Sequence, residues 1–236
     1  MSMKKLMVLV VVLLAVWSVR PMAGVDQSPA VAALARARGA QGGEASFGAI
    51  HSMQIEISDG GVHRLMLPAR FQLANAAAAF SFEGPTFSSS NGLTGRMADM
   101  AQLNARTAQM RDWLVFLLTV PANSGIDVKT GPDATIDGQA VATVVGSAGP
   151  TATIEIWFAK SSGRTVGYRT TRATVTATGE VGGIDATDVR IRTFQRIGGA
   201  EFPQNADTNS ARTGPGTFTA KVTINPAPSV DKFFEK

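Results

Sequence analysis

Residues 151–160, TATIEIWFAK, alternate between apolar and polar side chains as far as Ile156, and this pattern decides the fold class. One face of the predicted strand carries Ala152, Ile154, Ile156 and Phe158. Residues 217–225, TFTAKVTIN, repeat the alternation. A period of two with one apolar and one wet face is typical of antiparallel strands that cover a core on one side only.

Similar runs follow one another through the C-terminal half. Turn residues such as Asp137-Gly138 separate them, so neighbouring runs can form hairpins. The expected strands are 125–130, 134–145 with a turn at 137–138, 151–160, 165–178, 185–196 and 217–225. Their shared apolar face must be buried against another element.

The partner of that face is predicted between residues 93 and 118, where apolar side chains recur at steps of three and four. This spacing indicates the longest helix, about 95–120, with Pro121 as its stop and a loop of small residues at 84–95 before it. The expected fold is therefore α+β: a curved antiparallel sheet, or incomplete β-barrel, wrapped around a long central helix. The methionine and leucine stripe on this helix is either core packing or an adaptable ligand surface.

A short helix is predicted nearer the N-terminus. Ser28 can cap it, Pro29 suits its first turn, and Gly42-Gly43 can end it. Alternation from residue 45 to 57 predicts a strand, and Asp59-Gly60-Gly61 a hairpin turn. Further strand segments are expected at 62–67, 71–73 and 77–82.

Residues 1–24 have the pattern of a secretory signal. Two lysines precede a run of about fourteen mostly apolar residues, which is too short to span a bilayer as a helix, and Ala23 and Gly24 follow. We expect cleavage near Ala23, with an uncleaved anchor as the alternative, and a single mature domain at 25–236. Loss of Lys4, Lys5 and Arg20 leaves 19 basic against 18 acidic side chains, so the basic balance of the full chain does not indicate nucleic-acid binding.

Composition excludes several classes of function. The chain of 236 residues has no cysteine, which rules out disulfides, thiolate metal sites and a cysteine nucleophile. Its two histidines, His51 and His63, lie on the first predicted hairpin and belong to no HExxH motif, and no GxSxG elbow is present. A two-residue turn at Gly60-Gly61 would place His63 opposite Ser58, and we expect both imidazoles to be exposed. The sequence predicts no catalytic residue, no metal site and no cofactor.

One set of charges is conspicuous in the last third of the chain: Arg164, Arg169, Arg172, Arg190, Arg192 and Arg196. Arg190 and Arg192 share a strand face by period two, as do Arg164 and Arg172 if their strand is regular. A solvated face of the sheet is the first interpretation. Contact with anionic lipid headgroups or an acidic partner is the alternative.

Several short motifs resemble a family of periplasmic proteins with the lipoprotein-carrier, or outer-membrane-lipoprotein-sorting, fold. The motifs that carry the resemblance are Gly42-Gly43, Leu67-Pro68-Ala69-Arg70-Phe71, Ile136-Asp137-Gly138-Gln139, Ile156-Trp157-Phe158, Ser162-Gly163-Arg164, the run 194–203, Ile224-Asn225-Pro226 and Asp231-Lys232-Phe233-Phe234. They extend over nearly the whole mature chain and resemble an uncharacterised bacterial branch. Ala159 and Lys160 depart from the family's acidic turn.

The resemblance implies a half-barrel whose apolar interior receives lipid or lipoprotein acyl chains without catalysis, and each buried CH2 would contribute about 0.8 kcal/mol. The candidate cavity residues are Ile55, Ile57, Leu65, Leu67, Met97, Met100, Met110, Ile154, Ile156, Phe158, Val222 and Ile224. Arg70 is the positional candidate for holding a closed state. A dry core made of the same residues is the competing interpretation.

The functional expectation is a non-enzymatic carrier in the periplasm, monomeric, with peripheral membrane contact. An envelope regulatory or scaffold module that binds a protein partner is the alternative, and a hydrolase is the third. None of these expectations involves nucleic acid.

Overall fold

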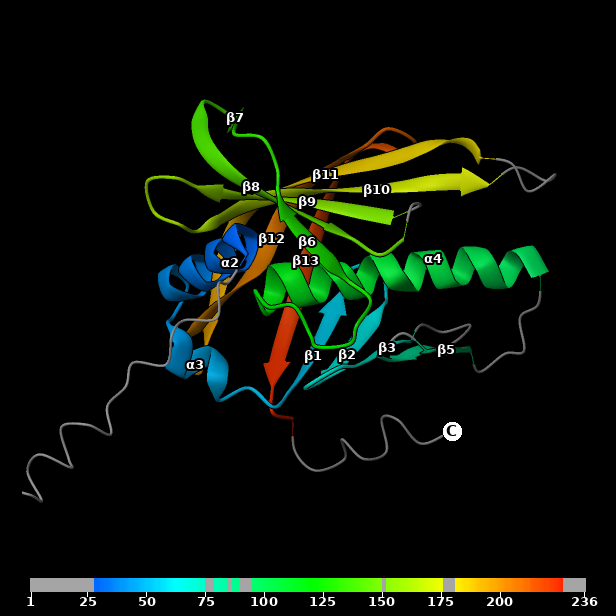
Figure 1. The fold of residues 1–236 in the computed structure, drawn as a ribbon, viewed down its shortest axis with the longest axis horizontal. Helices are drawn as coiled ribbons and strands as arrows, with labels where there is room; N and C mark the ends of the chain where they lie inside the picture. Colours follow the sequence, from blue (N-terminus) through cyan, green and yellow to red (C-terminus); the bar gives the residue numbers. More distant parts are fainter. Residues whose placement is uncertain are drawn as a thin grey trace, which may run out of the picture.

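A computed structural model describes residues 28–74, 79–84, 86–89, 95–149, 152–175 and 181–226 (Figure 1). The predicted signal segment 1–24 lies outside these ranges. The strands are β1 (Ser52–Ile57), β2 (Val62–Met66), β3 (Arg70–Ala74), β4 (Ala79–Glu83), β5 (Thr86–Ser89), β6 (Asp127–Thr130), β7 (Ala134–Ile136), β8 (Gln139–Ser147), β9 (Ala152–Ala159), β10 (Thr165–Val175), β11 (Val181–Ile197), β12 (Ala200–Ser210) and β13 (Gly214–Ile224).

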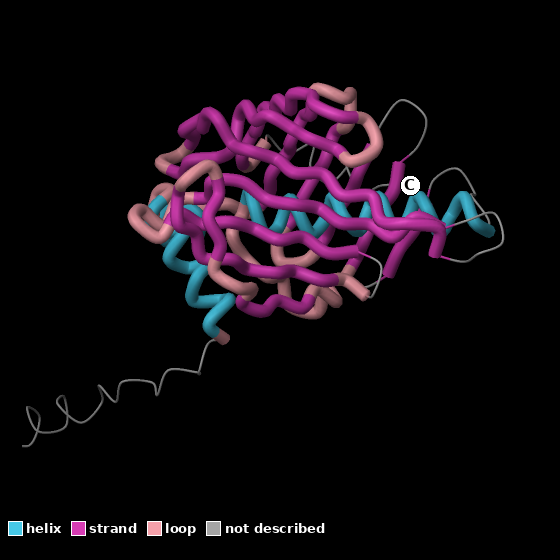
Figure 2. Tube along the Cα trace, turned by 90° about the horizontal axis from the view of Figure 1, so that it is seen from above, coloured by secondary structure: helices cyan, strands magenta, loops and turns pink. Residues whose placement is uncertain are grey.

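All these strands belong to one antiparallel sheet in the order β5-β4-β3-β2-β1-β13-β12-β11-β10-β9-β8-β6, with β7 on β8. The last strand, β13, closes on the first, β1, and Met53 pairs with Ile224. The sheet curls around the helix α4 (Gly95–Arg111), which runs along its concave side (Figures 1 and 2). The predicted α+β class and the curved, open sheet around a helix are confirmed.

The central helix ends earlier than predicted. After Arg111 the chain widens into a π-helical turn, η1 (Asp112–Phe116), and Leu118 then takes a left-handed φ of 51°. All five side chains of η1 are buried. In the sequence the apolar spacing continues to Val120. The residues after Arg111 nevertheless form a wide turn, because their side chains are buried in the core on every side of the turn.

Of the two predicted segments at the N-terminal side, one is found as expected and one differs. The helix α2 (Pro29–Ala40) lies where the capping signals indicated, and the Ser28 hydroxyl accepts a hydrogen bond from the Val31 amide at 3.4 Å. The alternation from residue 45, however, begins with a helical turn, α3 (Glu44–Gly48), which buries Phe47 in the core, and β1 starts only at Ser52.

The sheet also contains two strands that the sequence did not predict. β5 falls in the segment expected to be a loop, where its small polar residues pair with β4. β12 has polar residues on much of both faces and contains Pro203, so it lacks the usual strand pattern. It forms because β11 and β13 pair with it on either side.

The core lies between the concave face of the sheet and the segment from Met110 to Leu118. Met110, Leu114, Val115 and Phe116 have no exposed surface, and neither have Ile55, Ile154 and Ile156 on the facing strands. At Gly146 the sheet approaches this segment so closely that a Cβ atom there would overlap the side chain of Leu114. Packing of this kind leaves a dry interior at this end of the half-barrel.

Candidate functional site

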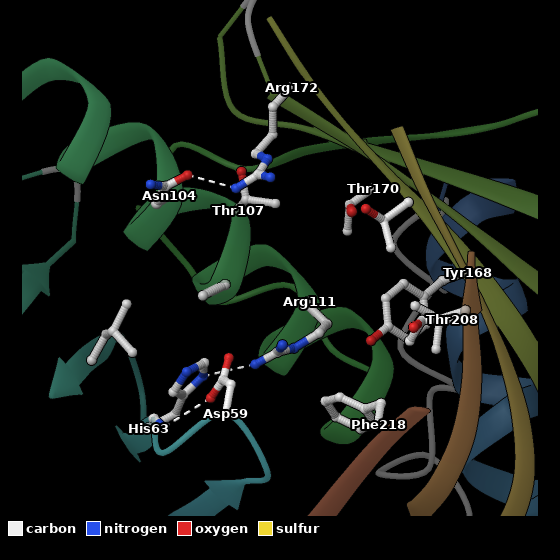
Figure 3. Close-up of a pocket in the computed structure, with 15 residues that line it drawn as sticks. Asp59, His63, Asn104, Thr107, Arg111, Tyr168, Thr170, Arg172, Thr208 and Phe218 are labelled. Atoms are coloured by element: carbon white, nitrogen blue, oxygen red, sulfur yellow. Dashed lines mark hydrogen bonds between the residues drawn. The ribbon is translucent and has the colours of Figure 1, made fainter. Parts of the chain in front are cut away.

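A pocket of about 440 Å³ lies between α4 and the concave face of the sheet (Figure 3). Its walls come from the β1–β2 loop, β2, β3, α4 and the strands β10 to β13. The lining residues are Asp59, Gly61, His63, Leu73, Asn104, Thr107, Ala108, Arg111, Tyr168, Thr170, Arg172, Thr187, Val189, Thr208 and Phe218. The volume is in the range of known small-molecule sites.

The pairing of β10 with β11 determines which side chains form one wall of the pocket. Tyr168 pairs with Val189 and Thr170 with Thr187, so these four side chains project from β10 and β11 on the concave face. Elsewhere on the concave face the equivalent positions are apolar and buried. Here three threonines, including Thr208 of β12, provide hydroxyl groups, while Val189 provides apolar surface. The pocket therefore offers both hydrogen bonds and apolar contact.

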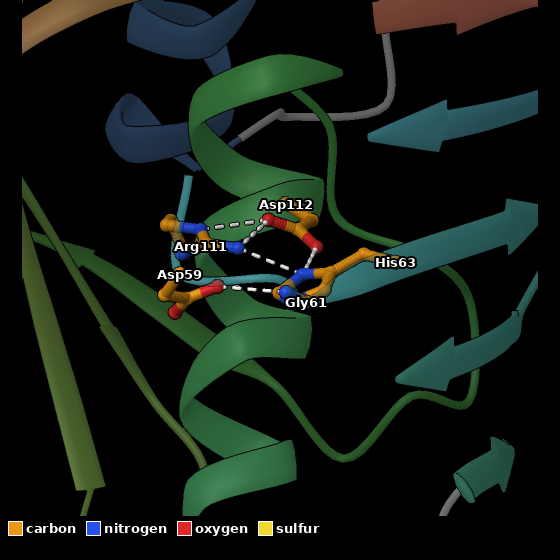
Figure 4. Close-up of polar contacts among 5 residues, drawn as sticks. All are labelled: Asp59, Gly61, His63, Arg111 and Asp112. Atoms are coloured by element: carbon orange, nitrogen blue, oxygen red, sulfur yellow. Dashed lines mark hydrogen bonds and ion pairs between the residues drawn. The ribbon is translucent and has the colours of Figure 1, made fainter. Parts of the chain in front are cut away.

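A buried cluster of charged and polar groups adjoins the pocket at the end of α4 (Figure 4). His63 Nδ1 lies 2.6 Å from Asp112 Oδ2 and 2.8 Å from Arg111 Nη2. Arg111 also donates from Nε to Asp112 Oδ1 at 2.7 Å. Asp112 has no exposed surface, so its charge depends on these two partners.

These contacts determine the ionisation of the cluster. Burial by itself would raise the pKa of Asp112, but the charges of Arg111 and His63 and the hydrogen bonds from both outweigh it, so the pKa lies below its usual value. Burial also raises the pKa of Tyr168 to about 12, against the opposing effect of Arg111. Asp112 is therefore a carboxylate and Tyr168 a neutral phenol at neutral pH.

The position of His63 corrects the expectation of an exposed histidine. The turn is a three-residue loop, residues 58–60, closed by a hydrogen bond from the Ile57 amide to the Gly61 carbonyl, and His63 pairs with Ile55. This register places His63 on the concave face beside Leu65, with only 4% of its surface exposed. His63 and the apolar Leu65 are two residues apart and therefore share a strand face, and this spacing is the signal in the sequence that could have predicted burial of His63. His51 is exposed, as expected.

Arg172 spans the pocket between helix and sheet. Its Nη1 donates to Asn104 Oδ1 on α4 at 2.6 Å, and its Nη2 donates to Asp185 Oδ2 on β11 at 2.5 Å. The expectation that Arg172 shares a regular strand face with Arg164 is wrong, because the β9–β10 register shifts between Thr165 and Gly167. Arg172 consequently lies on the concave side.

The predicted cavity residues gather mostly in the packed core. Eight of them belong to the buried cluster: Ile55, Ile57, Leu65, Met110, Ile154, Ile156, Phe158 and Val222. Ile224 packs against this cluster, Met100 is half-buried on α4, Leu67 is exposed, and the side chain of Met97 lies outside the described part. None of the described ones lines the pocket under α4, although Phe158 borders a separate one near α2.

Arg70, the candidate closure residue, lies on β3 and donates to Glu83 Oε1 from both Nε and Nη2, at 3.1 and 2.9 Å. It is exposed and does not line the pocket under α4. The residues that do line this pocket were mostly absent from the prediction. Arg111, Tyr168 and the threonines appear in the sequence as ordinary helix and strand residues.

The pocket offers hydrogen-bonding groups and apolar surface to a ligand. A contact between a histidine and a carboxylate, such as that of His63 with Asp112, also occurs in acyl-transfer sites, where the imidazole is hydrogen-bonded to a nucleophilic hydroxyl. No hydroxyl group is hydrogen-bonded to His63 among the described residues. The described part also contains no group of three or more side chains that could hold a metal ion. None of its helices is long and apolar enough to cross a membrane.

No protein-family model matches the chain, and no curated protein matches it. Among solved structures, a LolA superfamily protein from Nitrosomonas europaea is 12% identical with a TM-score of 0.41, covering 88% of this chain and 97% of that one. A DUF1329 family protein from Desulfovibrio piger is 9% identical with a TM-score of 0.43, covering 89% and 98%.

A third solved structure is the domain of a putative outer membrane lipoprotein-sorting protein from Vibrio parahaemolyticus. It is 8% identical with a TM-score of 0.39 and covers 78% of this chain and 88% of that one. At these values no residue role is transferred from any of the three. The first and the third of these structures are a LolA superfamily protein and a lipoprotein-sorting domain, the kind of protein that the sequence motifs resemble.

Proposed function

We propose that the protein is an exported, non-enzymatic binding protein of the periplasm, with one domain at 25–236, and that the pocket under α4 holds an amphipathic ligand of the lipid class. The observation that carries this proposal is the two-sided lining of the pocket. Hydroxyl, amide and guanidinium groups stand on β10 to β12 and α4, and Leu73, Ala108, Val189 and Phe218 provide apolar surface.

This lining favours a ligand that has both kinds of surface. An entirely apolar molecule would leave Thr170, Thr187 and Thr208 without water or partners, and desolvating each unpaired hydroxyl costs about 1–3 kcal/mol. An entirely polar molecule would gain nothing from Val189 and Phe218. A lipid headgroup or ester next to an acyl segment satisfies both surfaces, and its apolar part contributes about 25 cal/mol for each Å² removed from water.

The contacts that Arg172 makes with Asn104 and Asp185 provide a way to retain a ligand in this pocket. Because Arg172 joins Asn104 on α4 to Asp185 on β11, it holds the helix against the sheet at the open side. The Arg172 side chain is one-third exposed, so the bridge can exchange with water as a ligand enters. The earlier closure candidate, Arg70, makes its contact with Glu83 on the neighbouring strand β4.

A substitution that fills the pocket tests this proposal. Ala108→Phe places a ring in the space between α4 and β11, and Ala35→Phe is the control on an exposed position of α2. A fluorescent fatty acid should bind the wild type and the Ala35→Phe variant, and binding to Ala108→Phe should fall at least about tenfold. Unchanged binding to a folded Ala108→Phe variant would refute the assignment of this pocket.

Native mass spectrometry of gently purified protein decides the class of ligand. A carrier should retain lipid, whereas the alternative regulatory module should retain a protein partner instead. Intact-mass measurement on the same sample should show loss of the N-terminal segment near Ala23. Full-length protein confined to the cytosol would contradict the proposed export.

A further inference from the structure

A second pocket, of about 340 Å³, lies on the opposite, convex side of the sheet and is bordered by three arginines. It is formed by the β7–β8 hairpin, the turn between β9 and β10, and the middle of β11. The arginines are Arg164, Arg190 and Arg192, which belong to the set that was conspicuous in the sequence. The concave binding site uses none of them.

Irregular strand pairing brings these side chains together. The register of β10 against β9 shifts between Thr165 and Gly167, and that of β11 against β12 shifts between Ile191 and Thr193. Bulges of this kind bend a strand and redirect its side chains. Arg190, Ile191 and Arg192 all border one pocket next to these shifts.

Aromatic rings hold two of the guanidinium groups in place. Trp157, Gly167 and Arg190 occupy one row across β9, β10 and β11. Because Gly167 has no side chain, Arg190 reaches across it and stacks on the Trp157 ring, with Cζ 4.4 Å from the ring centroid. Arg164 stacks in the same way on Phe194 at 4.5 Å. Such stacking orients a planar guanidinium without using its hydrogen-bond donors.

Of the three arginines, Arg190 has the weakest contacts from its guanidinium donors. Arg164 donates to Glu201 at 2.6 Å and Arg192 to Asp207 at 2.7 Å. Among the described residues Arg190 has two distant ion pairs, to Asp137 Oδ2 at 3.6 Å and to Asp188 Oδ2 at 3.8 Å. Its buried Nη1 has no hydrogen-bond partner in the described part of the chain, and the same holds for Arg164 Nε.

We propose that this arginine pocket binds a phosphate group, as a phosphate monoester or diester, with Arg190 as the principal contact. A tetrahedral oxyanion can accept from the Nε and Nη2 edge of Arg190, whose carboxylate contacts are 3.6 and 3.8 Å long. Arg164 and Arg192 stand at the border of the pocket, already paired with Glu201 and Asp207. The nearest carboxylate, Asp137, is two-thirds exposed on the β7–β8 turn, so it can turn into solvent when an anion enters. The phosphate can belong to a free solute or to the headgroup of an anionic lipid.

Arg190→Gln tests the proposal, with Arg196→Gln as the matched control. Arg196 lies on the same strand, is exposed, and does not border the pocket, so both variants lose one charge. Binding of inorganic phosphate is measured by calorimetry, and binding to vesicles by co-sedimentation with phosphatidylcholine alone or with added phosphatidylglycerol. The concave pocket lies on the other face of the sheet from the Arg190 side chain, so the fluorescent fatty acid should bind both variants as it binds the wild type.

Removal of the charge-assisted hydrogen bonds should weaken phosphate or phosphatidylglycerol binding at least about tenfold in Arg190→Gln and less than about twofold in Arg196→Gln. Loss of phosphate binding assigns a soluble ligand, and loss of vesicle binding alone assigns a lipid headgroup. Absence of both activities in the wild type overturns the proposal, as does an equal loss in both variants, which indicates diffuse charge. If Arg190→Gln fails to fold, Arg190→Lys replaces it, and wild-type affinity in that variant would also overturn the proposal.

Discussion

The two ends of the segment formed by α4 and η1 meet the same sheet in different ways. Around η1 the contact is dry, because Leu114 and Phe116 are completely buried against apolar strand residues. One to two turns earlier, Asn104 and Ala108 border an open pocket opposite the threonines of β10 to β12. A single helix axis therefore serves as core at one end and as the wall of a binding site at the other.

The difference arises from which side chains the sheet presents. On β9 the concave positions are all apolar, with Ile154 and Ile156 at the centre, and they pack in the same core as Leu114. On β10 and β11 the corresponding positions are Thr170 and Thr187, whose hydroxyl groups are poorly suited to a dry contact. The buried cluster of His63, Arg111 and Asp112 stands at the border between the two regions.

The largest expected effect on stability comes from a pair of variants, one with a carboxylate in the dry core and one with a carboxylate at the pocket. Met110→Asp should prevent folding, because Met110 is fully buried and an unpaired carboxylate there costs several kcal/mol, comparable with the stability of a domain. Ala108→Asp, two residues away, projects toward the pocket and should cost about 1 kcal/mol, mostly helix propensity. Thermal melting of both variants measures the contrast. Equal destabilisation would show that the pocket is as dry as the core.

Asp112→Asn should give the next largest effect. It leaves Arg111 buried without its counter-charge, and breaking such a pair costs about 3–5 kcal/mol. Chemical denaturation at neutral pH measures the free energy of unfolding of each protein.

The same carboxylate predicts a pH dependence. Because the pKa of Asp112 is lowered in the folded protein, its ionisation stabilises the fold above the ordinary carboxyl pKa, and this stabilisation is lost as the pH falls through the folded value. Acid should therefore destabilise the wild type more steeply than Asp112→Asn. Parallel acid profiles would show that Asp112 does not contribute.

Two glycines sharpen the comparison on the side of the sheet. A Cβ atom at Gly146 would overlap Leu114, so Gly146→Ala should destabilise by about 1–3 kcal/mol through overpacking. A Cβ atom at Gly216, near the pocket, would meet only the Thr208 hydroxyl at 3.0 Å. Gly216→Ala should change stability by less than about 1 kcal/mol, since side-chain adjustment and reduced unfolded-state entropy offset each other. Similar losses in urea denaturation would contradict this contrast.

The smallest expected effect is the raised pKa of Tyr168, which is measured by absorbance. Tyr168 is the only tyrosine of the chain, so absorbance of the tyrosinate ion reports this residue alone. Its pKa should be about 12, because burial disfavours the anion. The resulting stabilisation is present below the ordinary pKa of about 10 and is lost as the pH rises toward 12. Titration near pH 10 in the folded protein would place Tyr168 in water.

Local patterns were enough to predict much of the architecture. The alternation at 151–160 and 217–225 and the three- and four-residue spacing in α4 indicated which faces are apolar, and burial of those faces requires a sheet around a helix. β12 could not be predicted because its pairing energy comes from neighbours on both sides. The π-helical turn was missed because apolar spacing alone does not distinguish a helix from a wider turn.

The candidate sites depended on tertiary structure. The three-residue hairpin loop pairs His63 with Ile55 on the concave face, and only the packing of β2 against the end of α4 brings it to Asp112, 49 positions away. Strand parity is local, so the sequence alone determined that Thr170 and Arg172 share a face. Only the curl of the sheet decided that this face meets α4, because contacts between distant segments depend on the sum of many weak packing energies.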